Sequence, residues 1–377
     1  MSAEVTVHQS PQVDPVAART LSAPPVASSS ARRALAVCDF WLGGNGYAGM
    51  KALRRAGWDV VVVPEWEYVP AKWRSFGMRA VGRLLRPFAV REFNRELVLQ
   101  AERERPELLL VFKGSFVTAA ALDRLRALGV RTYCFYPDNS FRAHGPHIPR
   151  ALPRYDWVFT AKSFGVEDMR RQLGVVRASV LLHGFDPDLH RPVPLAADAI
   201  ARYGCDVSFI GTWSPKKERL LTALRRGRPS IQLRIWGEQW HNARSPELRE
   251  AIGGHEVVGE QYVRAIRASR INLAILSEQR AGSSSGDRIT SRTFHIPAAG
   301  GFMLHERTEE VSARFREDVH CACFADADEL IEKVDLYLAD DERRSRVTES
   351  GHHLVRSRDS WDHRVREIVA RHEELSR

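Results

Sequence analysis

The sequence contains few cysteines and no long hydrophobic run. It has 5 cysteines in 377 residues. This excludes the dense disulfide framework of a small secreted domain and indicates a reducing compartment, so we expect a cytoplasmic protein. No apolar run reaches the roughly 18 residues that a membrane-spanning helix needs. Runs such as residues 60–63 and 108–112 have the length of buried strands, and residues 1–30 lack the apolar region of a secretory signal.

Patterns for metal binding and for nucleophilic catalysis are also missing. Only Cys321 and Cys323 are close together, and a lone C-x-C pair lacks the second pair of ligands that a zinc site needs. No Ser/His/Asp or Cys/His set occurs at a diagnostic spacing. We therefore expect neither a bound metal nor a cofactor.

The charge of the chain is strongly positive. The net charge is +9 and the pI is about 9.6, and arginine is far more frequent than lysine. Such a charge is compatible with a phosphate-bearing ligand, with nucleic acid or with a biased base composition. A nucleic-acid surface would show a basic stripe with interleaved aromatic residues, whereas the arginines are scattered through amphipathic stretches such as residues 121–128. We therefore expect no nucleic-acid partner.

The first half of the chain alternates between strand and helix patterns. Residues 1–32 are rich in Ser, Ala and Pro without periodicity, so we expect them to form a disordered arm. From residue 33 a strand, a glycine-rich loop, a helix and a second strand follow one another, and this βαβ order predicts a parallel sheet. The expected strands are residues 34–40, 59–64, 108–113, 131–136, 156–160 and 179–182. The expected helices are residues 46–56, 93–105 and 118–128.

A second alternating set follows a linker rich in Pro and Asp at residues 184–194. Its expected strands are residues 206–210, 232–236, 271–276 and 302–305, and its expected helices are residues 218–224, 262–268, 294–298 and 327–338, with two more within 341–377. The sequence therefore predicts an α/β protein with two Rossmann-like, doubly wound parallel-sheet domains that face each other across a cleft. We place the domains at residues 33–190 and 191–356, and a C-terminal helix at 357–377 that packs back on the first domain.

Ligands of open parallel sheets bind at the carboxyl ends of the strands, so the loops that follow the strands supply the candidate residues. In the first domain these residues are Gly43, Gly44, Asn45, Lys113, Asp138 and His183. The glycine-rich loop can present backbone N–H groups to a ligand, or it can be a tight strand–helix turn. It matches neither the G-x-G-x-x-G pattern nor the P-loop, which disfavours a dinucleotide site and a Walker-type site.

In the second domain basic residues follow the first strand. Gly211 and Thr212 end this strand, and Lys216 and Arg219 come shortly after them. These cations can neutralise a diphosphate, or they can form a solvated cluster at a helix start. Positive charge opposes the helix dipole at that end, which favours a bound anion. Gly237, after the next strand, would let a nucleotide base lie against the sheet.

A second anion-binding pattern precedes the expected helix at residues 294–298. Ser291, Arg292 and Thr293 combine two hydroxyls, a guanidinium and helix N–H groups, which suits a diphosphate. Ser291 can also be a simple helix N-cap. Arg288 is a second candidate cation. Residues 281–287 are rich in Gly and Ser, and we expect them to form a mobile loop beside this site.

The second half of the sequence resembles a known family. Residues 207–212, together with Arg219, look like the opening of the donor domain in CgeB-like (spore-maturation type) glycosyltransferases, and residues 291–304 are similar to that family's central signature. The pattern continues through residues 306–310, Phe324, 329–330, 337–338 and Gly351. In the first half, residues 183–186 resemble the N-G-V-D-like step that ends the first domain of family 4 glycosyltransferases.

The resemblance implies a GT-B fold in a bacterial enzyme. The nucleotide sugar would bind to the second domain and the acceptor mostly to the first, and no metal would be needed. For an inverting reaction, which needs a general base, Asp138 is the first candidate and His144 the second. Asp138 can also be a turn-forming residue, and a retaining reaction needs no such base.

One position departs from the family pattern. His295 stands where the family commonly has a Glu that binds the ribose, so His295 and Glu310 are our candidates for the ribose hydroxyls. Because an unperturbed imidazole titrates near pH 6.5, we expect the affinity for the donor to vary between about pH 5.5 and 7.5.

We therefore expect a hexosyltransferase-like glycosyltransferase (EC 2.4). It would move a sugar from a nucleotide-diphosphate sugar to a hydroxyl of a glycan, protein or small-molecule acceptor, and basic residues would stabilise the leaving diphosphate. A sugar-nucleotide epimerase on the same fold and a non-catalytic sugar-nucleotide-binding or coat protein are the alternatives. Turnover of the sugar nucleotide without an acceptor would indicate the epimerase, and binding without turnover the non-catalytic protein.

Overall fold

The computed structural model describes residues 32–38, 41–68, 76–254 and 256–377, without the side chains of 76–83. The arm predicted at residues 1–32 lies outside this range except for Arg32. The chain folds into two compact units. We call them the N-unit, which holds described residues 32–183, Gln279–Ser285 and Trp361–Arg377, and the C-unit, which holds Gly184–Glu278 and Gly286–Ser360.

The N-unit contains a six-stranded parallel sheet with the strand order β2-β1-β3-β4-β5-β6. Its strands are β1 (Arg33–Val37), β2 (Asp59–Val62), β3 (Leu108–Phe112), β4 (Arg131–Tyr136), β5 (Trp157–Thr160) and β6 (Ala178–Val180). All residues of β3 are buried, as a strand with a helical layer on each face must be. The predicted strands are therefore present, although residues 39–40 of the first one lie outside the described residues.

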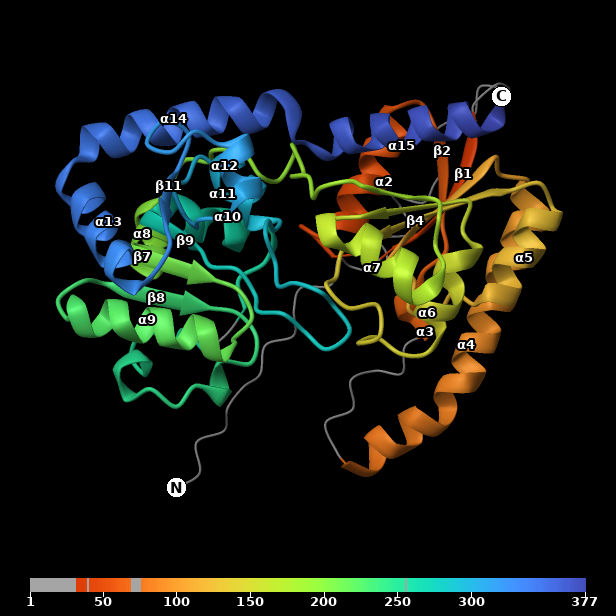
Figure 1. Ribbon diagram of the computed structural model, residues 1–377, viewed down its shortest axis with the longest axis horizontal. Coiled ribbons are helices and arrows are strands. Elements are labelled where there is room, and N and C mark those ends of the chain that lie inside the picture. Colours follow the sequence, from red (N-terminus) through yellow and green to blue (C-terminus); the bar gives the residue numbers. More distant parts are fainter. Residues whose placement is uncertain (1–31, 39–40, 69–75, 255) are drawn as a thin grey trace. The chain divides into compact units, whose positions relative to one another are not determined.

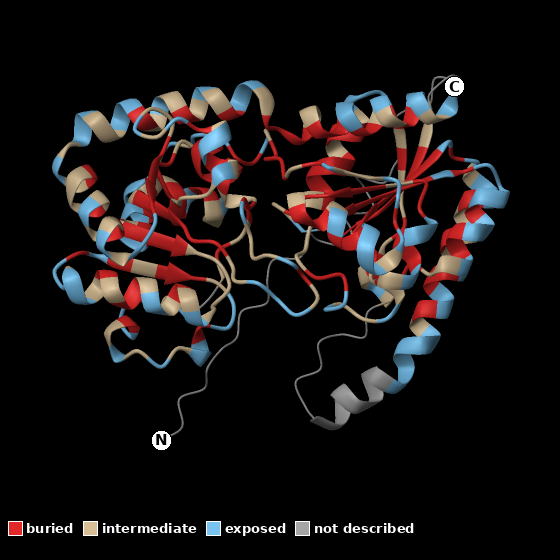
Figure 2. Ribbon diagram, in the orientation of Figure 1, coloured by how far each residue is buried: buried red, intermediate tan, exposed pale blue. Residues whose placement is uncertain are grey.

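Helices cover both faces of this sheet (Figure 1). The helical elements are α2 (Asn45–Arg55), α3 (Glu65–Tyr68), α4 (Phe76–Glu104), α5 (Ala119–Ala127), α6 (His147–Ala151), η1 (Leu152–Arg154), α7 (Ser163–Leu173) and α15 (Trp361–Ser376). One hydrophobic cluster joins α4, α5 and α7 to one face of the sheet, and a second joins α2 and α15 to the other face. The strands are buried and the outer faces of the helices are exposed (Figure 2).

The last helix, α15, supplies core residues to the N-unit. Trp361 packs edge-on against Phe112 at 5.5 Å and Phe135 at 5.1 Å between ring centroids. His372 Nδ1 lies 3.0 Å from the hydroxyl of Tyr133, and Arg364 donates to the carbonyl of His183. The end of the chain thus completes the hydrophobic core around β3 and β4.

The C-unit contains a five-stranded parallel sheet with the strand order β11-β10-β9-β7-β8. Its strands are β7 (Cys205–Ile210), β8 (Leu233–Trp236), β9 (Ser269–Ala274), β10 (Met303–Glu306) and β11 (Ala322–Phe324). Its helical elements are α8 (Ala197–Tyr203), α9 (Pro215–Gly227), η2 (Trp240–Asn242), η3 (Pro246–Leu248), α10 (Gly259–Ala268), α11 (Arg292–Ala298), α12 (Glu309–Arg314), α13 (Ala327–Ala339) and α14 (Asp341–Arg358). Side chains of α9 and α13 share one core cluster with the strands.

Two predictions about elements need correction. The helix expected at residues 93–105 begins 17 positions earlier, because α4 runs from Phe76 to Glu104 and contains Pro87. The elements that were not expected are the helices α3, α6, α7, α8 and α12, the turns η1–η3 and the strand β11. No helix among the described residues combines the length and the apolar character that crossing a membrane requires.

Candidate functional site

The parallel sheet of the C-unit brings the loops after β7, β9 and β10 to one edge. Phe209 of β7 is paired with Leu273 of β9, and Leu273 is paired with Leu304 of β10. The loop that starts at Gly211 therefore lies beside Arg292. A Cβ at Gly211 would be 2.7 Å from Nη1 of Arg292, so this glycine leaves the space that the guanidinium fills. Two residues that the sequence proposed separately are thus brought together.

The guanidinium of Arg292 is held by backbone carbonyls. Nη2 donates to the carbonyl of Ile275 at 2.7 Å and Nη1 to that of Ile210 at 3.4 Å, and the group lies 5.3 Å from the centroid of the Phe209 ring. Its Nε is buried and has no hydrogen-bond partner. Among the described residues, Arg292 forms no ion pair with a carboxylate. Burial lowers the pKa of Arg292, but an arginine remains charged, so the site holds a positive charge without a bonded counter-charge.

The three cations after β7 have different surroundings. Lys216 Nζ lies 2.5 Å from Glu306 at the end of β10. Lys217 is buried, and its Nζ donates to the carbonyl of Thr212 and to the hydroxyl of Ser277, both at 3.0 Å. Arg219 is exposed on α9. Lys217 therefore holds the loop of Thr212 in place.

Two carboxylates at this edge were not singled out from the sequence. Glu278 Oε1 accepts a hydrogen bond from the backbone of Lys216 at 2.7 Å, and Glu306 Oε2 accepts one from the backbone of Leu276 at 2.9 Å. Burial opposes ionisation of Glu278, but hydrogen bonds from Ser214 and from backbone N–H groups keep its pKa below the usual value. The signal that could have found both residues is their position at the carboxyl ends of β9 and β10.

Gly237 lies against the loop that holds Gly211. Its φ is +134°, and a Cβ at this position would be 2.3 Å from the carbonyl oxygen of Gly211. The same carbonyl accepts a hydrogen bond from Nε1 of Trp240 at 2.9 Å. A side chain at Gly237 would displace this loop, and the contact with a nucleotide base that the sequence proposed for Gly237 stays a prediction.

The Ser291–Thr293 segment points its two hydroxyls to different surroundings. Ser291 occupies the N-cap position of α11, but its side chain makes no capping hydrogen bond. Thr293 is fully buried. Its hydroxyl lies 2.8 Å from Nε2 of His305 and accepts a hydrogen bond from the backbone of Thr290. In this structure the Thr293 hydroxyl links α11 to His305 of β10 inside the core. Its predicted contact with a diphosphate stays a prediction.

His295 is buried in a stack of aromatic rings. Its ring lies 4.0 Å from that of His190 with an interplanar angle of 20°, and Tyr262 packs edge-on at 6.0 Å. Nε2 lies 3.2 Å from the carbonyl of Gly184, and because a carbonyl only accepts, this nitrogen carries the proton. Burial, then the charges of His190 and Arg292, lower the pKa of His295 well below its usual value. The imidazole is therefore neutral, and the pH dependence that we expected from it between about pH 5.5 and 7.5 is not supported.

The remaining ribose candidate lies in the segment after β10. Glu310, on α12, forms an ion pair with Arg288 at 3.7 Å. The backbone carbonyl of Arg288 accepts a hydrogen bond from the hydroxyl of Thr308, which is the N-cap of α12. Arg288 and Glu310, predicted separately as ligands of the diphosphate and the ribose, are thus paired.

Three predicted residues of the N-unit meet at the carboxyl ends of β3 and β4. Lys113 Nζ and His144 Nε2 lie 3.0 Å and 2.9 Å from the same oxygen, Oδ2 of Asp138. Burial raises the pKa of Asp138, but the hydrogen bond from His144 and the charge of Lys113 outweigh it and hold the pKa well below the usual range. Asp138 is therefore ionised at neutral pH.

The glycine-rich loop of the N-unit lies beside His183. Gly43 has a φ of +99°, Gly44 is the N-cap of α2, and Asn45 is its first residue. Oδ1 of Asn45 lies 3.5 Å from Nδ1 of His183. Asn45 and His183, which the sequence proposed separately, therefore lie close together, and Gly43 and Gly44 lead into α2 beside them.

Residues 279–285 are held by several hydrogen bonds within the N-unit. The backbone of Ser284 donates to Asp168 at 2.8 Å, and the carbonyls of Ala281 and Gly282 accept from Ser140 at 2.8 Å and Gln172 at 3.0 Å. The segment expected to be a mobile loop therefore has specific partners in this structure.

Carboxylates are the ligands that hard divalent cations prefer, and the chain has two Asp-x-Asp triplets, at residues 186–188 and 326–328. Asp326 caps α13 by accepting from the backbone of Asp328 and Glu329, and Asp186 accepts from the backbone of Asp188. Within the described part of the chain, no group of three or more His, Cys, Asp or Glu side chains is arranged to hold a metal ion.

Comparisons with known proteins agree with this architecture. Residues 216–370 match the family model described as "Glycosyl transferase-like". No curated protein matches the sequence. Sucrose-phosphate synthase from Thermosynechococcus elongatus has a similar structure, with a TM-score of 0.63, 14% identity, and coverage of 91% of this chain and 99% of that one.

Two further solved structures are similar. Anabaena HepE in complex with UDP-glucose has a TM-score of 0.60 and 11% identity, covering 91% of this chain and 99% of that one. A putative UDP-N-acetylglucosamine 2-epimerase from Listeria monocytogenes has a TM-score of 0.52 and 10% identity, covering 90% and 95%. Residues 216–370 are thus glycosyl transferase-like in sequence, and the chain as a whole has the α/β fold of the GT-B glycosyltransferases.

Proposed function

We propose that this protein is a CgeB-like glycosyltransferase that moves a sugar from a nucleotide-diphosphate sugar to an acceptor hydroxyl. The observation that carries the proposal is the guanidinium of Arg292, which donates to two backbone carbonyls, has a buried Nε without a hydrogen-bond partner, and forms no ion pair with a carboxylate among the described residues. Asp287 is the acidic group whose charge acts on it, and a diphosphate bound there would add a counter-charge in direct contact. HepE, which shares the fold, was solved with UDP-glucose.

The donor would bind at the carboxyl-end edge of the C-unit sheet. Arg292 and Ser291 would face the diphosphate, with the loop of Gly211 and Thr212 beside it. His295 keeps Nδ1 as an acceptor because Nε2 donates to Gly184, so one ribose hydroxyl could donate to it. The guanidinium would stabilise the charge that develops on the leaving diphosphate, and this supports a reaction without a metal.

The acceptor would bind near Asp138 in the N-unit. A carboxylate with a low pKa is a weak base, and Oδ2 of Asp138 already faces both Lys113 and His144. We therefore assign the base of an inverting reaction to His144, and we assign Asp138 to hold the His144 ring. The acceptor oxygen forms a bond to C1 as the bond from C1 to the diphosphate breaks, and His144 Nδ1 takes the hydroxyl proton, because Nε2 donates to the Asp138 carboxylate.

The test is a survey of UDP-, GDP- and TDP-sugars in the presence of EDTA, with and without a panel of acceptors. Transfer of the sugar with release of the nucleoside diphosphate is the expected result, lost in Arg292→Met and kept in Arg264→Met, which changes an exposed arginine paired with Glu260. His144→Asn should lower the rate of transfer without weakening donor binding. Conversion of the sugar nucleotide to an isomer without an acceptor would favour an epimerase, and a putative epimerase shares this fold. Binding without any turnover would favour a non-catalytic protein.

A further inference from the structure

The C-unit has a pocket at the amino ends of its strands, opposite the carboxyl ends where Arg292 lies. The pocket has a volume of about 480 Å³ and is lined by Ser269 and Arg270, which begin β9, and by Gly301 and Phe302, which precede β10. All strands of this sheet are parallel. The amino ends that line this pocket are therefore separated by the length of the strands from the carboxyl ends where Gly211 and Arg292 lie.

One face of α14 forms a wall of this pocket. Arg344, Thr348 and His352 follow one another at intervals of four residues and therefore share a face of the helix. Ser345 and Glu349, with the same interval, lie next to them. The wall thus offers one cation (Arg344), two hydroxyls, one carboxylate and an imidazole whose pKa burial lowers, groups that can bind the hydroxyls of a ligand.

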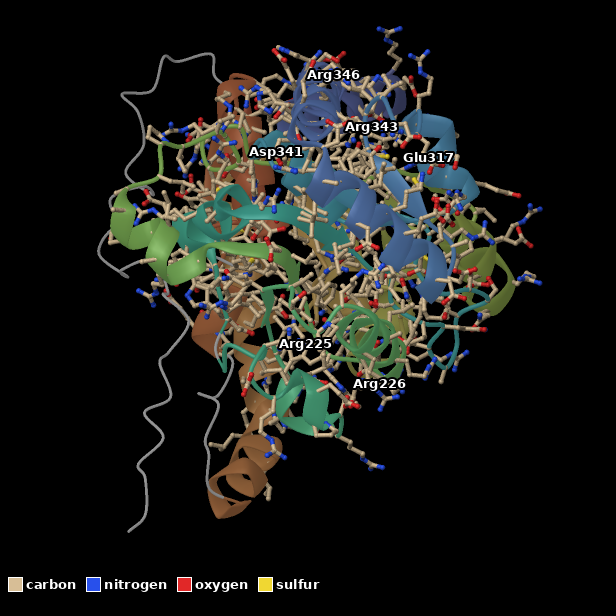
Figure 3. The ribbon with its side chains drawn as sticks, turned by 90° about the vertical axis from the view of Figure 1, so that its left-hand side faces the viewer. Arg225, Arg226, Glu317, Asp341, Arg343 and Arg346 are labelled. Carbon is tan, nitrogen blue, oxygen red and sulfur yellow. The ribbon has the colours of Figure 1, made fainter. Side chains whose placement is uncertain are left out.

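Two of the three lining arginines are already paired. Arg270 and Arg344 lie 2.8 Å and 2.7 Å from the same carboxylate, that of Asp341. Asp341 is the first residue of α14 and is labelled in Figure 3. Arg270 also pairs with Asp206 at 3.3 Å. These contacts hold the two side chains in fixed positions and neutralise much of their charge.

Arg267 is the lining arginine whose charge is not bonded to a carboxylate. Nη1 donates to the carbonyl of Gly300 at 2.8 Å, whereas Nε is buried without a hydrogen-bond partner, and no ion pair of Arg267 is present among the described residues. Gly300 has a φ of +75°, and a Cβ there would lie 3.2 Å from Nη1 of Arg267 and 3.1 Å from Pro192. The glycine turn therefore makes room for this guanidinium.

We propose that this pocket binds a sugar phosphate. Because Nε of Arg267 is buried and one N–H of Nη1 donates to Gly300, phosphate oxygens would bind the remaining N–H groups of Nη1 and Nη2. Ser345, Thr348 and Glu349 can form hydrogen bonds with sugar hydroxyls. The volume is within the range of pockets that hold small metabolites. The proposal does not depend on the activity assigned to the edge with Arg292.

The test is calorimetric titration of the full-length protein with glucose 6-phosphate, inorganic phosphate and glucose. Glucose 6-phosphate should bind, and Arg267→Met should weaken it at least tenfold. Arg264→Met, which changes an exposed arginine on the same helix that pairs with Glu260, should bind like the parent, and so should Arg292→Met. Ser345→Trp, an exposed position that should tolerate the change, should block the pocket and abolish binding even if Arg267→Met fails to fold.

Three outcomes would overturn the proposal. The first is that the parent binds none of the probes, and the second is that Arg264→Met weakens binding as much as Arg267→Met. The third is that binding is lost in Arg292→Met but kept in Arg267→Met and Ser345→Trp, which would move the ligand to the other edge of the sheet. Inorganic phosphate binding as tightly as glucose 6-phosphate would contradict recognition of the sugar.

Discussion

At the scale of single residues, the shape of Arg292 matters as much as its charge. The guanidinium donates to the carbonyl of Ile210 at the end of β7 and to that of Ile275 just after β9, and it lies over the ring of Phe209. An ammonium group cannot reproduce this planar arrangement. We therefore expect Arg292→Lys to weaken the binding of a nucleoside diphosphate by about tenfold or more, since a charge-assisted hydrogen bond contributes roughly 1.5–3 kcal/mol. Calorimetry would measure the affinity, with Arg264→Lys, at an exposed arginine outside the predicted site, as the matched control. Equal affinity in Arg292→Lys and the parent would contradict this prediction, because it would show that the positive charge at this position is enough to bind the nucleoside diphosphate.

The buried imidazole of His305 makes stability depend on pH. Burial lowers the pKa of His305 from 6.5 to about 4. Below pH 6.5 the unfolded chain therefore binds a proton that the folded chain does not, and the free energy of unfolding falls as the pH drops towards 4. At 1.36 kcal/mol per pH unit, the loss between pH 6.5 and 5 is about 2 kcal/mol. Stability in His305→Gln should decrease less over this range when measured by urea unfolding.

The matched control for this prediction is His353→Gln, because the His353 side chain is 75% exposed. This variant should show the pH dependence of the parent. An equal loss of stability on acidification in His305→Gln and in the parent would mean that His305 is not held neutral in the folded state.

The sequence could place candidate residues at strand ends but could not say which of them pair. Lys113, Asp138 and His144 meet because β3 and β4 are neighbours in the sheet, and the apolar runs predicted these strands but not their order. The contact of Thr293 with His305 depends instead on how α11 packs against β10. Its pattern of Ser, Arg and Thr in the sequence looks the same whether a hydroxyl faces a ligand or the core.

At the scale of elements, the close approach of two loops depends on Gly237. We expect Gly237→Ala to lower the free energy of unfolding by more than the roughly 1–3 kcal/mol that a strained backbone alone costs, because its Cβ would also collide with the carbonyl of Gly211. Gly254→Ala is the matched control, since Gly254 also has a positive φ, of +70°, but nothing within 4 Å of the added Cβ. Chemical denaturation should show a larger loss for Gly237→Ala, and equal losses would contradict the collision.

The strands were the most predictable elements and the short helices the least. The central strands are continuous apolar runs buried on both faces, such as Leu108–Phe112, and such runs mark parallel sheets. The strand β11 has only three residues and was missed, whereas β6, also of three residues, overlaps a predicted strand, so length alone does not explain the difference. The first part of α4 contains Gly77, Gly82 and Pro87, residues that disfavour helix in isolation, so its extension could not be predicted from propensity.

At the scale of the whole molecule, the C-terminal helix α15 belongs to the N-unit, which the first half of the chain forms. Trp361 is buried against Phe112 and Phe135, and truncating a buried tryptophan costs about 3–5 kcal/mol. We expect Trp361→Ala to lower the hydrogen-exchange protection of β3 and β4 while that of β7 and β9 stays unchanged. Trp240→Ala, which removes a buried tryptophan of the C-unit, should have the opposite pattern. A uniform loss of protection in Trp361→Ala would contradict the assignment of α15 to the N-unit.

The measurement that tests the central claim most directly is calorimetric titration of the EDTA-treated protein with UDP, GDP and TDP. The account predicts that at least one nucleotide binds without added metal, and that Arg292→Met weakens this binding by about tenfold or more, because a charge-assisted contact of roughly 1.5–3 kcal/mol is lost. No binding by any of the three, a strict requirement for a divalent cation, or equal affinity in Arg292→Met would contradict the account.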